Sequence, residues 1–103
     1  MYYTYILKSL KIPGAIYIGY TSDLKSRLES HNSPENQGYT KRHAPWEVES
    51  YLAFTEEGDA KRFEVYLKSS SGKAFMRKRL ISNQFREALA EFNNGRKQLN
   101  ETN

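Results

Sequence analysis

Two short runs rich in aromatic and β-branched residues flank a Pro-Gly turn near the start of the chain, and this arrangement constrains the fold more than any other feature. The runs are residues 2–8 and 15–20, and Pro13-Gly14 lies in the segment between them. Tyrosine and isoleucine favour strands, whereas Pro-Gly marks a turn. The pattern predicts a β-hairpin with Tyr5 on its first strand and Tyr17 on its second.

A helix is predicted to follow this hairpin directly. Thr21 and Ser22 are good N-cap residues, and the carboxylate of Asp23 suits the positive end of a helix dipole. At about 100° per residue, Arg27 and His31 fall within the same arc of roughly 100° as the apolar stripe of this helix. These two polar side chains therefore flank the face directed at the sheet, which is a position suited to a functional site.

The rest of the chain predicts a third strand and further helices. Residues 32–45 are rich in polar residues, basic residues and turn formers, which predicts a loop. Apolar residues in 46–54 alternate well enough for a strand. Thr55 can cap a helix whose apolar stripe runs to Leu67. After an interruption by three serines and a glycine, residues 73–82 predict a short basic helix.

Charge and composition bound the function classes. The net charge is +4, and the segment from Lys61 to Arg79 holds seven basic residues against one acid. Acidic partners such as nucleic acid are therefore plausible. The chain has no cysteine, which excludes disulfides and thiolate metal sites. Neither a signal peptide nor an apolar run of about 20 residues is present, so we expect a soluble, cytoplasmic protein without membrane contact.

The one acid of that basic segment, Glu64, lies at the margin of the apolar stripe of its predicted helix. Such a carboxylate is a reasonable ligand for a Mg²⁺ ion that keeps most of its waters. With Arg27 to bind a phosphate, these groups fit metal-assisted phosphoryl hydrolysis. A phenol or an imidazole would take a proton from the attacking water. A free tyrosine has a pKa near 10, so Tyr5 as the base needs nearby positive charge or a relay through His31.

The same residues carry a family resemblance. The motifs are, in chain order, Tyr3-Thr4-Tyr5, Tyr17-Ile18-Gly19, Arg27, His31 and Glu64. Together they resemble the GIY-YIG nuclease superfamily. A wider string comprises Tyr17-Ile18-Gly19-Tyr20-Thr21-Ser22-Asp23-Leu24, Arg27-Leu28, His31-Asn32, Tyr39-Thr40-Lys41 and Lys68. This string is similar to the small stand-alone branch of UvrC-type, UPF0213-like GIY-YIG proteins, and the resemblance covers about residues 2–80.

The resemblance implies an α+β (mixed α/β) fold, in which a small mixed sheet of three strands is flanked by helices. By this reading, residues 1–82 form the GIY-YIG nuclease-like domain. Residues 83–95, whose apolar spacing predicts one more helix, form a C-terminal helical extension. Residues 96–103 are expected to be a disordered tail.

The resemblance also implies a function, a metal-dependent endonuclease that cuts DNA with little sequence specificity. It implies a single divalent ion, Mg²⁺ or Mn²⁺, on Glu64. Arg27 and the two tyrosines, Tyr5 and Tyr17, would line the scissile phosphate, and His31 would assist the tyrosine that acts as base. Four basic residues are expected to contact the nucleic acid: Lys41, Lys68, Lys73 and Arg77. The alternative is a binding module of the same fold with little or no cleavage.

Two departures from the family pattern and several simpler interpretations stay open at this point. The first motif reads Tyr-Thr-Tyr, which keeps the third position, Tyr5. Residues 68–73 offer no asparagine where many active members have one. Either Lys68, Ser70 or Lys73 contacts the phosphate in its place, or turnover is poor. Glu64 could also simply pair with Lys61 or Lys68, since ion pairs one helical turn apart are common.

The other candidates have plain structural interpretations too. Tyr5 and Tyr17 could be cross-strand packing partners. His31 could be a charge near the negative end of its helix. The basic residues of 73–79 could form a solvated helix face.

Overall fold

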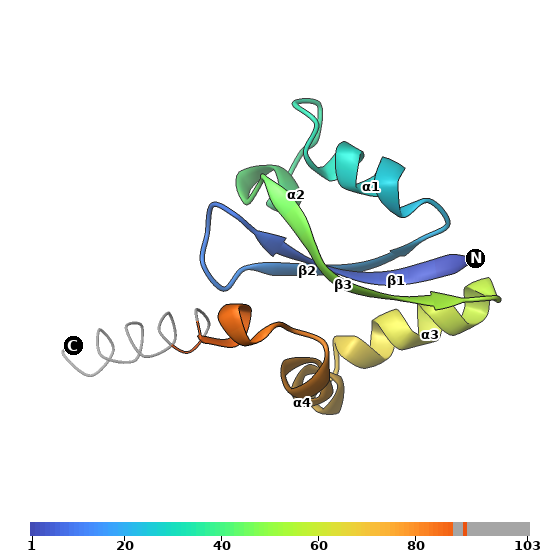
Figure 1. Cartoon of the computed structure of the whole chain (residues 1–103). Helices are drawn as coiled ribbons and strands as arrows, with labels where there is room; N and C mark the ends of the chain where they lie inside the picture. The colour runs from blue at the N-terminus through green and yellow to red at the C-terminus, as the bar shows by residue number, and fades with distance from the viewer. Residues whose placement is uncertain (88–89, 91–103) are drawn as a thin grey trace.

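The computed structural model describes residues 1–87 and residue 90, and its centre is a three-stranded sheet (Figure 1). The strands are β1 (Tyr2–Ser9), β2 (Ile16–Thr21) and β3 (Trp46–Phe54), in the order β2-β1-β3. The predicted hairpin and the third strand are thus confirmed, as is the α+β class. Both strand pairs are antiparallel, so the sheet is not mixed as the resemblance implied.

Side chains of β1 alternate between two covered faces of the sheet, as expected for a strand. Tyr5 and Leu7 lie in one buried cluster with Trp46, against which the apolar residues of α1 (Leu24–His31) pack. Ile6 points to the other face and packs with Ile18 and residues that follow β3. Figure 1 shows α1 and α2 on one side of the sheet and α3 and α4 on the other. Tyr5 therefore belongs to the core as well as to the candidate site.

On the first face, the helix start and one loop differ from the predictions. Asp23 is the N-cap of α1, since its carboxylate accepts a hydrogen bond from the Ser26 N–H at 3.0 Å. The hydroxyl of Thr21 instead accepts from the N–H of Asp23. The predicted loop contains a short helix, α2 (Tyr39–Arg42). One bond that fixes this turn is donated by the Trp46 indole to the Thr40 carbonyl, and such a side-chain contact leaves no periodic sequence signal.

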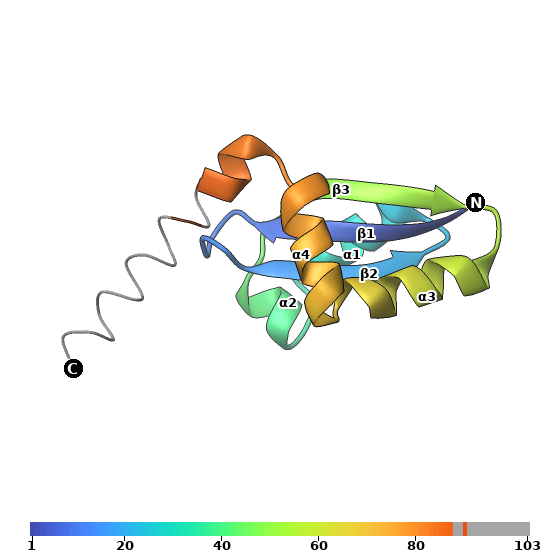
Figure 2. The ribbon, with the colours of Figure 1, turned by 90° about the horizontal axis from the view of Figure 1, so that it is seen from below.

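The second face carries α3 (Glu57–Leu67) and α4 (Ser70–Arg79). The N-cap of α3 is Glu56 and not Thr55, and it makes no side-chain capping bond. The predicted interruption is shorter than expected, because Ser69 caps α4 by accepting a hydrogen bond from the Gly72 N–H at 3.1 Å. Figure 2 shows α3 running along the strands beside β2, whereas α4 lies across them.

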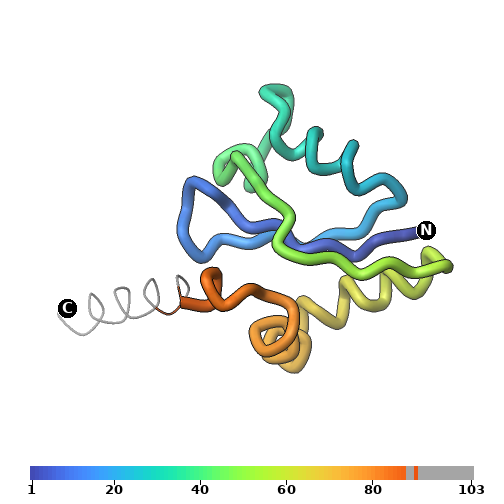
Figure 3. Tube along the Cα trace, in the orientation of Figure 1, coloured from blue at the N-terminus to red at the C-terminus, as the bar shows by residue number. Residues whose placement is uncertain are grey.

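The chain path in Figure 3 shows β3 leading from the face of α1 and α2 to the face of α3 and α4. Residues 83–87 are helical, and most of the predicted extension over 83–95 lies outside the described residues, as does the whole predicted tail over 96–103. Within the part of the chain that the structure describes, no helix is long and apolar enough to cross a bilayer.

Candidate functional site

A pocket of about 460 Å³ opens at the edge strand β2 and is walled by β1, β2, α1 and α3. Four of the five residues predicted to act in catalysis line it. Its lining consists of Tyr2, Tyr5, Tyr17, Gly19, Tyr20, Thr21, Ser22, Arg27, Glu57 and Glu64. The fifth, His31, is 8% exposed and lies behind the Tyr5 hydroxyl. The structure therefore brings a guanidinium, a carboxylate and two phenols to one cavity.

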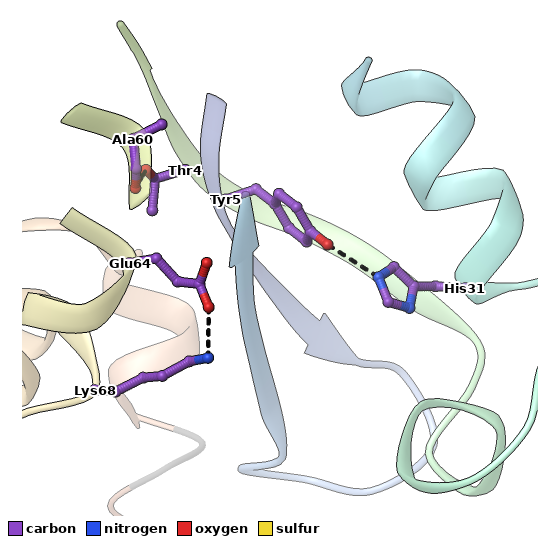
Figure 4. Close-up of polar contacts among 6 residues, drawn as sticks. All are labelled: Thr4, Tyr5, His31, Ala60, Glu64 and Lys68. Atoms are coloured by element: carbon purple, nitrogen blue, oxygen red, sulfur yellow. Dashed lines mark hydrogen bonds and ion pairs between the residues drawn. The ribbon is translucent and has the colours of Figure 1, made fainter. Parts of the chain in front are cut away.

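The Tyr5 hydroxyl and Nε2 of His31 are 3.0 Å apart, within hydrogen-bonding distance (Figure 4). His31 is the last residue of α1, and its ring centroid lies 4.8 Å from that of Tyr17. Burial, together with the Tyr17 side chain, raises the pKa of Tyr5 well above its ordinary value, and the nearby Arg27 charge only partly opposes this. Tyr5 is thus a neutral phenol at ordinary pH.

The pKa of His31 shifts in the opposite direction to that of a salt-bridged histidine. Burial lowers it first, and the Arg27 guanidinium lowers it further. The imidazole is therefore neutral near pH 7, and one of its two ring nitrogens can accept a proton. A neutral acceptor facing a neutral phenol is an arrangement that can relay a proton.

Gly19 is opposite Tyr5 in the β1–β2 ladder, and its lack of a side chain makes room for the phenol. A Cβ at this position would lie 2.5 Å from the Tyr5 hydroxyl oxygen and 2.8 Å from its Cζ. Real Cβ atoms do not approach so closely, so any larger residue would displace the hydroxyl from His31. The glycine of the second motif is thus explained by packing against Tyr5.

Glu64 projects from α3 and is mostly covered, with a side chain 19% exposed. Its Oε1 accepts a hydrogen bond from the Lys68 ammonium at 2.6 Å (Figure 4). The simpler interpretation of Glu64 as half of an i,i+4 pair is therefore realised with Lys68, while the same carboxylate also lines the pocket. The two interpretations do not exclude each other.

A contact that the sequence did not predict ties the turn carrying Glu64 to β1. The buried Thr4 hydroxyl donates to the Ala60 carbonyl at 2.8 Å. In an α-helix the carbonyl of residue 60 also accepts from the N–H of residue 64. Because Thr4 and Tyr5 are consecutive and face opposite sides of the sheet, one peptide unit of β1 holds both Glu64's helical turn and the phenol (Figure 4).

The donor set fits a hard divalent cation held weakly by protein. Among the described residues, no group of three or more His, Cys, Asp or Glu side chains could hold a metal ion. Mg²⁺ does not need one, because it keeps several waters and binds through one or two carboxylates and a substrate phosphate. Glu64 offers the carboxylate oxygens that such an ion binds. The Lys68 ammonium lies at the same carboxylate, so this position already accommodates a positive charge.

Glu57 is a second carboxylate of the pocket, and the sequence analysis missed it as a site residue. A signal was present, because Glu57 and Glu64 are seven residues apart and so share one face of α3. Each is paired with the lysine four residues later: Lys61 lies 3.3 Å from Glu57, and Lys68 lies 2.6 Å from Glu64. The two acids that α3 presents to the cavity are therefore each paired with a lysine that does not line it.

The four predicted nucleic-acid contacts are not gathered at one place. Lys68 reaches Glu64, whereas Lys41 lies on α2, with its ammonium 3.4 Å from the Pro34 carbonyl. Lys73 and Arg77 are exposed on α4. None of these four residues lines the pocket, so their part in binding stays a prediction.

Comparisons with known proteins identify the family of this chain. The family model described as the GIY-YIG catalytic domain matches residues 1–79. A UPF0213 protein of Lactococcus lactis subsp. cremoris is 30% identical over 91 residues, which are 88% of this chain and 91% of that protein. Another, from Bacillus pumilus, is 35% identical over 66% of this chain and 67% of its own length.

A solved structure is also similar to this chain. It is the solution NMR structure of the UPF0213 protein BH0048 from Bacillus halodurans, at 27% identity and a TM-score of 0.49. The similarity covers 84% of this chain and 92% of that chain.

Proposed function

This chain belongs to the GIY-YIG catalytic domain family, and we propose that it is an endonuclease that hydrolyses phosphodiester bonds in DNA with a single divalent ion. The observation that carries the proposal is the convergence of Tyr5, Tyr17, Arg27 and Glu64 on one pocket, with His31 bonded to Tyr5. A guanidinium and a carboxylate on opposite walls suit a phosphodiester flanked by a cation. Recognition that depends on phosphates would give little sequence specificity.

Arg27 binds the scissile phosphate in this proposal. Its guanidinium offers paired N–H donors that match two phosphate oxygens. Arg27 also lines a second, polar cavity of about 470 Å³ that shares Thr21 and Ser22 with the first and adds the hydroxyls of Ser26 and Ser30. The guanidinium therefore stands where the two cavities meet, and a nucleic-acid backbone can extend from one into the other.

The raised pKa of Tyr5 argues against a free phenolate as the base, so we assign the proton to a relay. As the water oxygen forms its bond to phosphorus, the water's proton passes to the Tyr5 oxygen. The Tyr5 hydroxyl proton passes to Nε2 of His31, 3.0 Å away. The bond from phosphorus to the leaving oxygen breaks in the same displacement. Tyr17 packs beside both rings and holds the His31 ring in place.

Glu64 would hold the divalent ion, Mg²⁺ or Mn²⁺. When bound, such an ion stabilises negative charge on the leaving oxygen. Lys68 is the best candidate for the contact that an asparagine makes in many active members, because its ammonium already lies at the Glu64 carboxylate. From there it can add positive charge near the same phosphate.

The first test is cleavage itself. Wild-type protein with Mg²⁺ or Mn²⁺ is expected to cut DNA, whether single-stranded, branched or duplex, and EDTA is expected to stop the reaction. Arg27→Ala is expected to lower kcat/KM on the order of a hundredfold through loss of a charged phosphate contact. Lys25→Ala is the matched control, since Lys25 is on the same helix but lines a different cavity. Absence of cleavage of every DNA and RNA substrate would refute the enzyme proposal.

The pH dependence follows from His31. Because the relay needs a neutral imidazole and the His31 pKa is lowered, the acid limb of kcat/KM is expected below the ordinary histidine value of about 6.5. The raised pKa of Tyr5 predicts no fall from phenol ionisation up to about pH 9. Rates measured from pH 5 to 9 on wild type and His31→Gln check this, and an acid midpoint above pH 7 would contradict it. Because the His31 pKa is lowered by folding, the unfolded chain binds a proton more readily, and the protein is less stable below about pH 6.5. Circular dichroism at each pH therefore distinguishes loss of activity from loss of fold.

The second candidate is a nucleic-acid-binding module with little cleavage. It is favoured by the missing asparagine and by the Lys68 ammonium, which competes with a metal ion for Glu64. Salt-dependent binding without metal-dependent cleavage would support it. In that case, Arg27→Ala would weaken binding and would have no rate to lower.

A further inference from the structure

Four aromatic rings from the end of β3, α3 and α4 form one cluster. The Phe63 ring lies 5.7 Å from Phe54, 5.9 Å from Tyr66 and 6.4 Å from Phe75, measured between centroids. Tyr66 and Phe75 are 6.2 Å apart. The Tyr66 and Phe75 side chains are 39% and 38% exposed, so these two rings of the cluster are open to solvent.

Core packing accounts for only part of this cluster. Phe63 is partly buried and packs against the core, as do Ile16 and Leu80, whereas Tyr66 and Phe75 are exposed. The two exposed rings are adjacent because α4 turns back tightly on α3, with Gly72 against the backbone of Tyr66. Exposed, contiguous aromatic side chains on a small domain mark an interaction surface.

The charges around the cluster indicate what binds it. From Ser70 to Arg79, α4 carries four basic residues and no acid. Lys78 and Arg79 follow Phe75 by three and four residues, which places them on the same side of the helix as its ring. Within the described residues, no carboxylate forms an ion pair with α4. Aromatic faces beside unpaired cations are what stacked bases and their phosphates require.

We propose that Tyr66 and Phe75 form a second nucleic-acid site, which stacks unpaired bases while Lys78 and Arg79 contact the phosphates. The identity of the ligand rests on the proposed function; the position of the site does not. Tyr66 and Glu64 are two residues apart and so lie on nearly opposite sides of α3. A strand leaving the pocket reaches the aromatic site by crossing the width of one helix, a distance of a few nucleotides.

Unpaired bases fit this surface better than duplex DNA does, because the faces of paired bases are already stacked on one another. The site therefore adds a preference for nucleic acid with a single-stranded segment next to the scissile phosphate. It would act without reading sequence, since every base has a flat face.

The test is binding in EDTA, so that it does not depend on cleavage. Fluorescence anisotropy compares a labelled oligothymidine with an abasic strand of the same length and with a duplex. Wild type is expected to bind oligothymidine more tightly than the abasic strand, and Tyr66→Ala or Phe75→Ala to weaken oligothymidine binding roughly tenfold. Binding of the abasic strand and duplex should not change, and Tyr66→Phe should restore the affinity. Val65→Ala is the control, an exposed apolar change on the same helix.

Three outcomes would overturn the proposal. Equal wild-type affinity for oligothymidine and the abasic strand would show that bases do not contribute. Equal losses on duplex and single strand, in alanine variants whose thermal melts match wild type, would show that the surface does not act by stacking unpaired bases. Self-association that Phe75→Ala abolishes, with oligothymidine binding unchanged, would assign the surface to a second copy of the chain. If wild type binds no nucleic acid at all, the proposed function itself fails.

Discussion

Glu64→Gln is expected to lower metal-dependent cleavage on the order of a thousandfold, with the fold and nucleic-acid binding retained. The change keeps the shape of the side chain but removes the charge that a hard divalent ion needs. A metal ion contributes several kcal/mol of charge stabilisation to such a displacement, and each 1.4 kcal/mol is about tenfold in rate. Single-turnover rates at saturating DNA, across a series of Mg²⁺ and Mn²⁺ concentrations, measure the loss.

Binding should move in the other direction. Removing a negative charge from a pocket that holds a phosphodiester leaves affinity equal or higher, so a rate loss with tighter binding isolates the metal role of Glu64. Glu57→Gln is the matched control, because Glu57 lines the same pocket two turns earlier and is also paired with a lysine. Loss of cleavage in Glu57→Gln but not in Glu64→Gln would contradict the proposal and would assign the metal to Glu57.

Much of the fold could be predicted because its signals are local. The two strands of the hairpin and the strand over 46–54 have their own composition, and the sheet faces of Tyr5 and Tyr17 follow from the period of two. Helix starts were less predictable. Thr55 is the better capping residue by type, yet Glu56 holds the N-cap position without a side-chain capping bond, so backbone conformation and not residue type sets this helix start. The α4 start was missed because Ser69 and Gly72 are read as breakers, yet together they form a cap.

The candidate site likewise has features that local sequence predicts and features that depend on long-range packing. Helical phase alone places Arg27 beside the apolar stripe, and the pocket lining agrees with that placement. The hydrogen bond from Thr4 to Ala60 joins residues that are 56 positions apart in the chain. A contact between such distant residues cannot be predicted from the periodicity of a single sequence. The raised pKa of Tyr5 was equally out of reach, because it depends on how deeply the sheet and α1 bury the phenol.

Gly72→Ala is expected to destabilise the protein strongly, although it adds only one methyl group. A Cβ on Gly72 would overlap the backbone carbonyl of Tyr66 and lie 2.7 Å from the Leu67 Cα. Neither is the end of a flexible side chain, so α3 and α4 must separate and disturb the buried cluster to which Leu67 and Met76 both belong. Such overpacking costs about 3 kcal/mol or more. At about 4–8 °C per kcal/mol, the melting temperature should fall by roughly 12 °C or more.

Gly58→Ala separates this clash from the general effect of replacing a helical glycine. The nearest atom to a Cβ on Gly58 is Nη1 of Arg62 at 3.3 Å, and that guanidinium can move aside. Alanine is the better helix former, so the unfolding free energy should stay the same or rise by up to about 1 kcal/mol. Urea unfolding of both variants measures the difference. Equal stabilities would mean that α4 does not pack against α3 as tightly as its glycine requires, and would also remove the reason for Tyr66 and Phe75 to lie side by side.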